Sequence, residues 1–145
     1  MKAAFAAGCF WHVQSEFDKF HGIIKTEVGY SGGEKGNPTY EEVSSGNTGH
    51  AETIEIEFNP ENVSYEEVLD QFWKIHDPTT PNRQGPDIGT QYRSIIFYYD
   101  EEQKRKAEKS LEEKQKGLDK KIVTEIRPMK KFWKAEGYHQ KYYKK

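Results

Sequence analysis

A short apolar strand that passes directly into an amphipathic helix is the feature of this sequence that most restricts its fold. Residues 3–7 are small or apolar, as in a buried strand. From residue 10 onward, large apolar side chains recur every three or four positions and predict one buried helix face: Phe10, Val13, Phe17 and Phe20. A strand and a helix joined by so short a turn, at Gly8 and Cys9, favour folds in which helices pack on a sheet.

Cys9 is the only cysteine of the sequence, and it stands where this helix is expected to begin. Unpaired backbone N–H groups at a helix N-terminus stabilise a thiolate, so we interpret Cys9 as a candidate nucleophile or redox group. Trp11 lies about 100° around the helix from Phe10, off the apolar stripe, where it can line a pocket beside the thiol. Two alternatives stay open: Cys9 is a small buried hydrophobic residue, or His12 is its base in a Cys–His hydrolase arrangement.

Length and charge exclude several classes of protein. A chain of 145 residues with 34% hydrophobic residues can bury one core, so we expect a single domain over residues 1–145. The net charge of -2 gives no basic field for nucleic acid. No apolar run is long enough for a membrane span or a secretory signal, and one unpaired cysteine fits a reducing compartment, so we expect a cytoplasmic protein. The five histidines show no close-paired spacing, so no metal site is predicted.

The rest of the chain alternates between predicted strands and helices. Further strands are predicted over residues 23–30, 52–58, 92–99 and 122–126, and helices over residues 40–45, 64–76 and 101–116. The long loop over residues 77–89 carries Asp87, and loops of this length inside a compact domain are typically functional. We therefore predict an α+β two-layer sandwich: a ferredoxin-like core of mixed β-sheet with helices on one face, followed by an irregular, aromatic-rich C-terminal tail.

Glu52 stands at the start of a strand that alternates in polarity. It shares its parity with the apolar residues of that strand, which are Ile54, Ile56 and Phe58. A carboxyl group on the apolar face would be held in its protonated form and would suit proton donation near neutral pH. The alternative is that Glu52 lies at the frayed strand end and points into water. The pattern leaves both interpretations open, because strand ends are poorly located from a single sequence.

Six short motifs occur in the same order as in a known family and span nearly the whole chain. They are Gly8-Cys9-Phe10-Trp11, Asn37-Pro38-Thr39-Tyr40, Thr48-Gly49-His50-Ala51-Glu52, Asp77-Pro78-Thr79-Thr80, Gly89-Thr90-Gln91-Tyr92-Arg93-Ser94 and Ala135-Glu136-Gly137-Tyr138-His139-Gln140. Together they resemble the peptide methionine sulfoxide reductases of type A.

The resemblance implies a peptide-methionine (S)-S-oxide reductase that repairs methionine sulfoxide in proteins and also acts on free methionine sulfoxide. The cysteine that matches Cys9 attacks the sulfoxide sulfur and becomes a sulfenic acid. The carboxylic acid that matches Glu52 protonates the oxygen, with help from hydroxyl groups that match Tyr40 and Tyr92. These roles are chemically consistent, because a sulfoxide oxygen is a poor leaving group until it is protonated.

The resemblance also assigns the binding residues. Phe10 and Trp11 match the apolar pocket that holds the S-methyl group of the substrate, and Asp87 matches the polar side of that pocket. The family uses no metal and no organic cofactor. His12 stands where glycine usually follows the tryptophan, and Ile88 where histidine is frequent, so this chain departs from the commoner family pattern at both positions.

The way in which the oxidised cysteine is recycled follows from a further departure. Ser44 stands where some members carry a resolving cysteine, and no second cysteine is present in the sequence. We therefore expect a monomer whose sulfenic acid is reduced by an external thiol, either thioredoxin or glutaredoxin with glutathione. Two rival functions stay open: a thiol peroxidase, and a non-catalytic module that binds methionine-containing peptides through Phe10 and Trp11.

Overall fold

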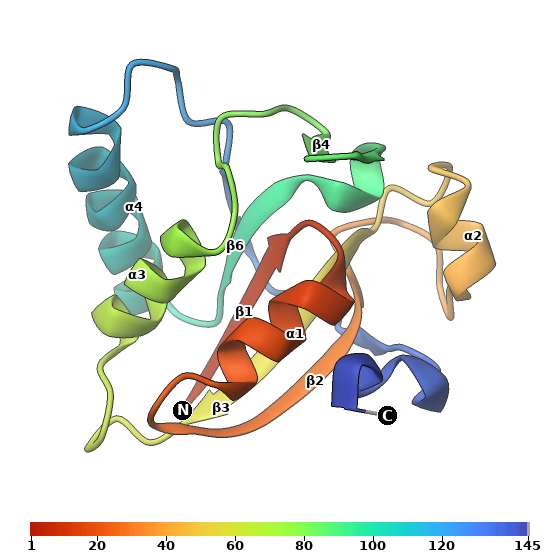
Figure 1. Ribbon diagram of the computed structural model, residues 1–145, viewed down its shortest axis with the longest axis horizontal. Coiled ribbons are helices and arrows are strands. Elements are labelled where there is room, and N and C mark those ends of the chain that lie inside the picture. Colours follow the sequence, from red (N-terminus) through yellow and green to blue (C-terminus); the bar gives the residue numbers. More distant parts are fainter. Residues whose placement is uncertain (145) are drawn as a thin grey trace.

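The computed structural model of the protein describes residues 1–144 (Figure 1). Its helices are α1 (Phe10–Asp18), α2 (Tyr40–Ser44), α3 (Tyr65–Lys74) and α4 (Glu101–Lys116). Its strands are β1 (Lys2–Ala7), β2 (Ile23–Ser31), β3 (Ala51–Phe58), β4 (Arg83–Gln84), β5 (Asp87–Ile88), β6 (Ser94–Tyr98), β7 (Glu125–Pro128) and β8 (Trp133–Lys134). Three short 3₁₀ turns are η1 (Thr90–Tyr92), η2 (Gly137–His139) and η3 (Tyr142–Lys144).

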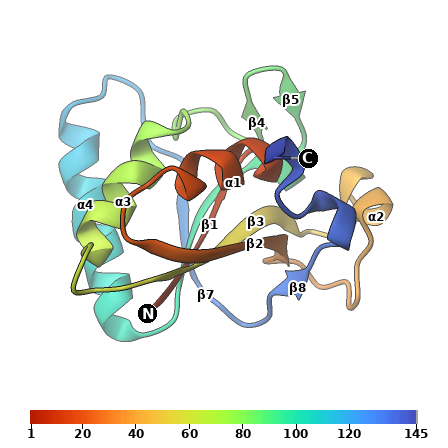
Figure 2. The same ribbon diagram turned by 60° about the horizontal axis from the view of Figure 1, so that its bottom comes forward.

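The main sheet has the strand order β7-β6-β1-β3-β2-β8 (Figures 1 and 2). β1 is antiparallel to both β3 and β6, and β2 is antiparallel to β3. The inner order β6-β1-β3-β2, with α1 and α3 in the two connections, is that of a ferredoxin-like core. β7 adds parallel to β6, and β8 adds antiparallel to β2. The predicted α+β fold with a mixed sheet is therefore confirmed.

The three long helices α1, α3 and α4 cover the same face of this sheet (Figure 2). Phe5 of β1 lies at the centre of that layer, with its ring centroid 5.7 Å from that of Phe17 on α1 and 4.8 Å from that of Phe72 on α3. A second, smaller apolar cluster lies on the opposite face and consists of Ala4, Ala6, Ala51, Ile95 and Phe97. β1 is thus buried on both faces, which explains its alanine-rich sequence.

Local capping signals fix where two helices begin. The Ser64 hydroxyl accepts a hydrogen bond from the backbone N–H of Glu67 at 3.1 Å, and the Glu67 carboxylate accepts one from the N–H of Ser64 at 3.0 Å. This reciprocal pair starts α3. The Asp100 carboxylate caps α4 in a similar way by accepting from the N–H of Gln103 at 2.8 Å. The helix predicted over residues 101–116 is confirmed with those bounds.

The strand predicted over residues 92–99 begins two residues later, at Ser94. Tyr92 instead ends η1, because its N–H donates to the carbonyl of Gly89 at 3.0 Å and the N–H of Arg93 donates to the carbonyl of Thr90 at 3.3 Å. These local bonds make the backbone turn just before it enters the sheet. Tyr92 therefore lies just before the start of β6 instead of within the strand.

The prediction of a last strand over residues 122–126 was wrong at its start, since β7 covers Glu125–Pro128. The N–H of Ile122 donates to the side chain of Gln115 at 2.8 Å, and the N–H of Val123 donates to the carbonyl of Pro78 at 2.8 Å. Both backbone groups are therefore engaged outside the sheet. The loop predicted over residues 77–89 contains the small hairpin of β4 and β5, and the tail expected to be irregular contributes β8 to the sheet.

Candidate active site

Cys9 and Glu52 meet where β1 turns into α1. Cys9 is the N-cap residue of α1 and makes no side-chain capping bond. The N–H of Phe10, the first residue of the helix, instead donates to Oε1 of Glu52 at 3.0 Å. Glu52 lies on the inward face of β3 and is only 2% exposed. The structure therefore places this carboxyl group inside the protein, and the alternative in which it points into water is wrong.

The surroundings of Glu52 favour its protonated form. Burial raises the pKa of this carboxyl group to about 7, the negative charge of Asp87 acts in the same direction, and the N–H of Phe10 opposes both. The second oxygen, Oε2, is buried and has no hydrogen-bond partner among residues 1–144. A carboxylic acid with one oxygen held and the other unpaired can donate a proton to a group that enters beside Cys9.

The pKa of the Cys9 thiol is raised, although its position at a helix N-terminus predicts a stabilised thiolate. The backbone N–H groups of Trp11 and His12 do lower its pKa, as expected for a helix N-terminus. Burial of the half-buried thiol and the negative charge of Glu52 outweigh them, so that the pKa of Cys9 lies above its ordinary value. The resting side chain is therefore a thiol and not a thiolate.

Two tyrosine hydroxyl groups have pKa values that depend on the charge of Glu52. Tyr40 is the first residue of α2 and Tyr92 the last residue of η1, and both are half-buried. Burial, followed by the negative charge of Glu52, raises the pKa of both hydroxyl groups. The pKa of Tyr92 is raised further by Tyr40, Asp87 and Cys9. Both phenols therefore keep their protons and remain hydrogen-bond donors near Glu52.

An aromatic cluster forms the other side of the site. Phe10 is 1% exposed, and its ring lies 5.8 Å from Tyr30 and 6.3 Å from Tyr40 between centroids. Trp11 is half-buried, and its indole stacks on Tyr142 of the tail with centroids 3.9 Å apart and planes 13° apart. The site thus has an acidic side at Glu52 and an aromatic side at Phe10 and Trp11.

The chain matches known proteins over its whole length. The family model described as "Peptide methionine sulfoxide reductase" matches residues 1–145. The chain belongs to the peptide methionine sulfoxide reductase family. It is 57% identical to peptide methionine sulfoxide reductase MsrA of Methanosarcina acetivorans over 146 residues, which cover 99% of this chain and 78% of that protein. It is 55% identical to MsrA of Methanothermobacter thermautotrophicus over 147 residues, with coverage of 99% and 86%.

Solved structures of the reductase family share the whole fold. Mxr1 from Saccharomyces cerevisiae in its reduced form matches 99% of this chain and 84% of its own with a TM-score of 0.95 and 38% identity. Methionine sulfoxide reductase A of Corynebacterium diphtheriae matches 97% of this chain and 72% of its own with a TM-score of 0.90 and 34% identity. The protein is thus a thiol-dependent oxidoreductase of a family that reduces methionine sulfoxide in peptides and proteins, without a prosthetic cofactor.

Two residues for which the sequence predicts no role, Glu136 and His50, hold parts of the candidate site in place. The Glu136 carboxylate accepts from the hydroxyl of Tyr30 at 2.9 Å and from the N–H of Tyr40 at 3.2 Å, so it anchors the start of α2. Nδ1 of His50 accepts from the N–H of Gly33 at 3.0 Å, which ties the preceding loop to the strand that carries Glu52. Both residues lie in motifs that carry the family resemblance, which is the only sequence signal for them.

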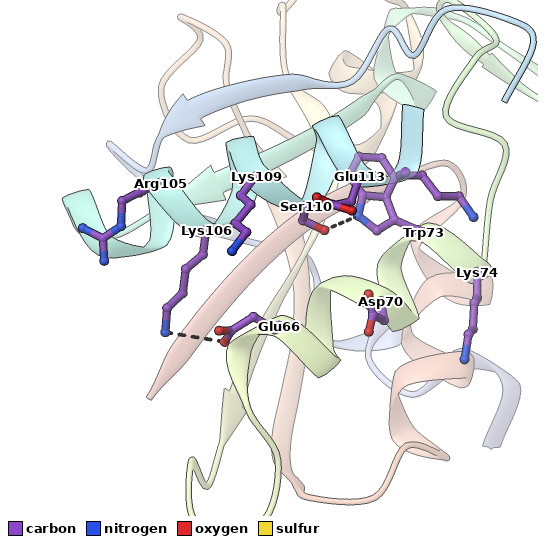
Figure 3. Close-up of a pocket in the computed structure, with 10 residues that line it drawn as sticks. Glu66, Asp70, Trp73, Lys74, Arg105, Lys106, Lys109, Ser110 and Glu113 are labelled. Carbon is purple, nitrogen blue, oxygen red and sulfur yellow. Dashed lines mark hydrogen bonds and ion pairs between the residues drawn. The ribbon is translucent and has the colours of Figure 1, made fainter. Parts of the chain in front are cut away.

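A surface groove lies away from this site. It has a volume of about 760 Å³ and runs between α3 and α4, where charged side chains of both signs line it (Figure 3). Inside it, the indole N–H of Trp73 donates to Ser110 at 2.7 Å and Lys106 pairs with Glu66 at 3.5 Å. Cys9 and Glu52 do not line this groove.

Among residues 1–144 of the reductase, no helix has both the length and the apolar character needed to cross a bilayer. Over the same residues, His, Cys, Asp and Glu side chains nowhere gather in groups of three or more that could hold a metal ion.

Proposed function

We propose that residues 1–145 form a single catalytic domain in which Cys9 and Glu52 reduce methionine (S)-sulfoxide, free or within proteins. The observation that carries this proposal is the buried carboxyl group of Glu52, hydrogen-bonded to the residue next to the thiol and with a pKa of about 7. An acid protonated near neutral pH, beside a sulfur nucleophile, supplies the two groups that the reaction needs.

In the proposed reaction, the sulfur of Cys9 attacks the sulfoxide sulfur while Glu52 gives its proton to the sulfoxide oxygen. The thiol proton of Cys9 passes to the carboxylate that results, so the acid is regenerated. The S–O bond and the transient bond between the two sulfur atoms then break as the protonated oxygen moves to the Cys9 sulfur, which becomes a sulfenic acid. The substrate sulfur gains two electrons and leaves as methionine, and the Cys9 sulfur loses two.

The remaining residues of the site orient the substrate in this proposal. Tyr40 and Tyr92, which keep their protons, donate hydrogen bonds to the sulfoxide oxygen and stabilise the charge that develops on it. Phe10 and Trp11 enclose the S-methyl group, and Asp87 lies on the polar side of the pocket. This proposal is supported by electrostatic effects within the site. The charge of Asp87 raises the pKa of Cys9, Glu52 and Tyr92, and the charge of Glu52 raises the pKa of both phenols.

We further propose that two external thiols reduce the sulfenic acid, with release of water and formation of a disulfide between them. Cys9 is the only cysteine among residues 1–145, so these residues contain no second thiol to resolve the sulfenic acid. Mxr1 from S. cerevisiae has been solved in complex with Trx2, and that structure matches 98% of this chain with a TM-score of 0.71 and 28% identity. It favours thioredoxin over the alternative of glutaredoxin with glutathione. A monomer in the cytoplasm, where such thiols are abundant, is part of this proposal.

A single-turnover experiment tests the function. The enzyme is mixed with stoichiometric methionine (S)-sulfoxide and no reductant, and the expected yield is about one methionine per chain with a dimedone adduct at Cys9. Cys9→Ser is the control and should release none. An unmodified Cys9 after methionine release would overturn the mechanism. Reaction with hydrogen peroxide much faster than with the sulfoxide would favour a thiol peroxidase instead.

A further inference from the structure

Arg93 follows Tyr92 directly and joins three parts of the chain through three different nitrogen atoms. Its Nη1 donates to the carbonyl of Thr90 in η1 at 2.9 Å, and its Nη2 donates to the carbonyl of Gly49 at 2.8 Å. Its Nε donates to the carboxylate of Glu125 on β7 at 3.0 Å. The side chain is only 15% exposed. Because a guanidinium group is planar and its donors point in fixed directions, these bonds set the relative positions of the three acceptors.

Two of these acceptors lie close in sequence to groups of the proposed site. Thr90 begins the turn that Tyr92 ends, and Gly49 lies three residues before Glu52. One guanidinium group therefore connects the segment that carries a phenol donor with the segment that carries the acid.

The rest of the fold holds these two segments to different degrees. Glu52 lies within the ladder of β2 and β3, which fixes its backbone on the sheet. Tyr92 lies before the ladder of β6 with β1, which begins at Ser94. The backbone bonds within η1 shape the turn, and a long bond of 3.3 Å from the side chain of Gln91 to the carbonyl of Ser44 connects it to α2.

η1 lies beside β3, and its attachment there depends on Arg93. Among residues 1–144, the hydrogen bonds that tie this turn to the residues just before β3 are those of the Arg93 guanidinium group. The position of Tyr92 relative to Glu52 therefore follows from the shape of one side chain.

We propose that Arg93 is a positioning residue that holds η1 against the start of β3, so that the Tyr92 hydroxyl and the Glu52 carboxyl group reach the same sulfoxide oxygen. This inference rests on the proposed function. Stabilisation of a developing charge requires a donor that is already in place, because a hydrogen bond weakens steeply when its geometry is poor. A misplacement of about 1 Å can lower a rate roughly 100-fold.

A double-mutant cycle in single turnover tests this role. The rate constant for methionine release is measured at saturating methionine (S)-sulfoxide without reductant, so that recycling of Cys9 does not contribute. Arg93→Met should lower this rate constant roughly 10- to 100-fold, with little change in the substrate concentration that gives half the maximal rate. In a chain that already carries Tyr92→Phe, the same substitution should lower it less than about twofold, because the hydroxyl group that it misplaces is absent.

Arg127→Met is the matched control. Arg127 donates to the carbonyl of Gly32 at 3.1 Å and pairs with the same Glu125 at 3.7 Å, but among residues 1–144 it makes no hydrogen bond to η1. Its loss should leave the single-turnover rate constant unchanged. If Arg93→Met does not fold, Arg93→Lys replaces it with the same expected losses, because its single nitrogen cannot reach the acceptors of three guanidinium nitrogens, while its charge beside Glu125 is kept.

The outcomes separate the two proposals. If the wild-type enzyme releases no methionine, the proposed function fails. If it does and a folded Arg93 variant keeps the full rate constant, the positioning role is wrong. Equal losses with and without the Tyr92 hydroxyl group would overturn the role, because Arg93 would then act through the fold in general. A loss in Arg127→Met as large as in Arg93→Met would overturn it as well. If Tyr92→Phe alone keeps the wild-type rate constant, the roles of Tyr92 and Arg93 are both wrong, whereas the reaction of Cys9 and Glu52 is unaffected.

Discussion

Replacement of Glu52 by Gln should remove a pH dependence of the protein's stability that this carboxyl group causes, and it should also remove activity. In the folded protein the pKa of Glu52 is raised from 4.5 to about 7 by burial, and its Oε2 atom has no partner among residues 1–144. The folded state therefore binds this proton more tightly than the unfolded state does. Stability from this group is complete below about pH 4.5, falls as the pH rises to about 7, and is constant above that.

The size of the effect follows from the two pKa values. At roughly 1.4 kcal/mol per pH unit, the raised pKa of Glu52 lowers the free energy of unfolding by about 3 kcal/mol at alkaline pH. About 2–3 kcal/mol of this change should occur between pH 5 and pH 8. Gln carries no charge and lacks this dependence. Its amide nitrogen, placed at the unpaired Oε2 position, adds a cost of about 1–3 kcal/mol that does not depend on pH.

The assay is urea denaturation of the wild type, Glu52→Gln and Glu57→Gln at about pH 5, pH 6 and pH 8. The readout is the change with pH of the difference in unfolding free energy, because a fixed cost cancels from it. Glu57→Gln is the matched control on the same strand, where the side chain is exposed, and its difference from the wild type should not change between pH 6 and pH 8. A constant difference between wild type and Glu52→Gln would refute the argument that burial holds this carboxyl group protonated.

Three further predictions follow from the site. In wild type, kcat should fall as the pH rises through about 7, because Glu52 then loses the proton that it donates; a flat profile from pH 6 to pH 8 would contradict this role. Tyr92→Phe should lower kcat roughly 100-fold with a small change in KM. Gly33→Ala should lower the melting temperature by several degrees, because a Cβ there collides with the backbone of His50, whereas Gly36→Ala, with space around it, should not.

The sequence correctly predicted those helices whose ends are determined by neighbouring residues. The helix over residues 101–116 and the start at Ser64 follow from charge spacing and a capping box, and both were confirmed. The start of β7 could not be predicted, because the N–H of Ile122 is taken by the side chain of Gln115, in a helix end seven positions earlier. Which backbone groups reach a sheet depends on such tertiary bonds.

In the candidate site, too, local effects could be predicted from the sequence and tertiary effects could not. The effect of a helix N-terminus on Cys9 is local and was predicted, but the burial that outweighs it depends on the folded surroundings. Sequence parity indicated that Glu52 was either buried or at a frayed end, and only packing decides between them. His139 could not be predicted as a partner of Trp11, because a hydrogen bond between residues 128 positions apart leaves no spacing signal.

The tail has a consequence for how the enzyme matures during synthesis. β8 pairs with β2 and covers an edge of the sheet, and the next residues bring His139 to Trp11. A nascent chain that ends before residue 133 would expose the edge of β2, which is a template for aggregation, and would carry a reactive thiol beside an unfixed tryptophan. Because contacts of such long sequence separation form slowly, docking of the tail is expected late in folding. Sulfoxide reduction would then report that the last part of the chain has docked.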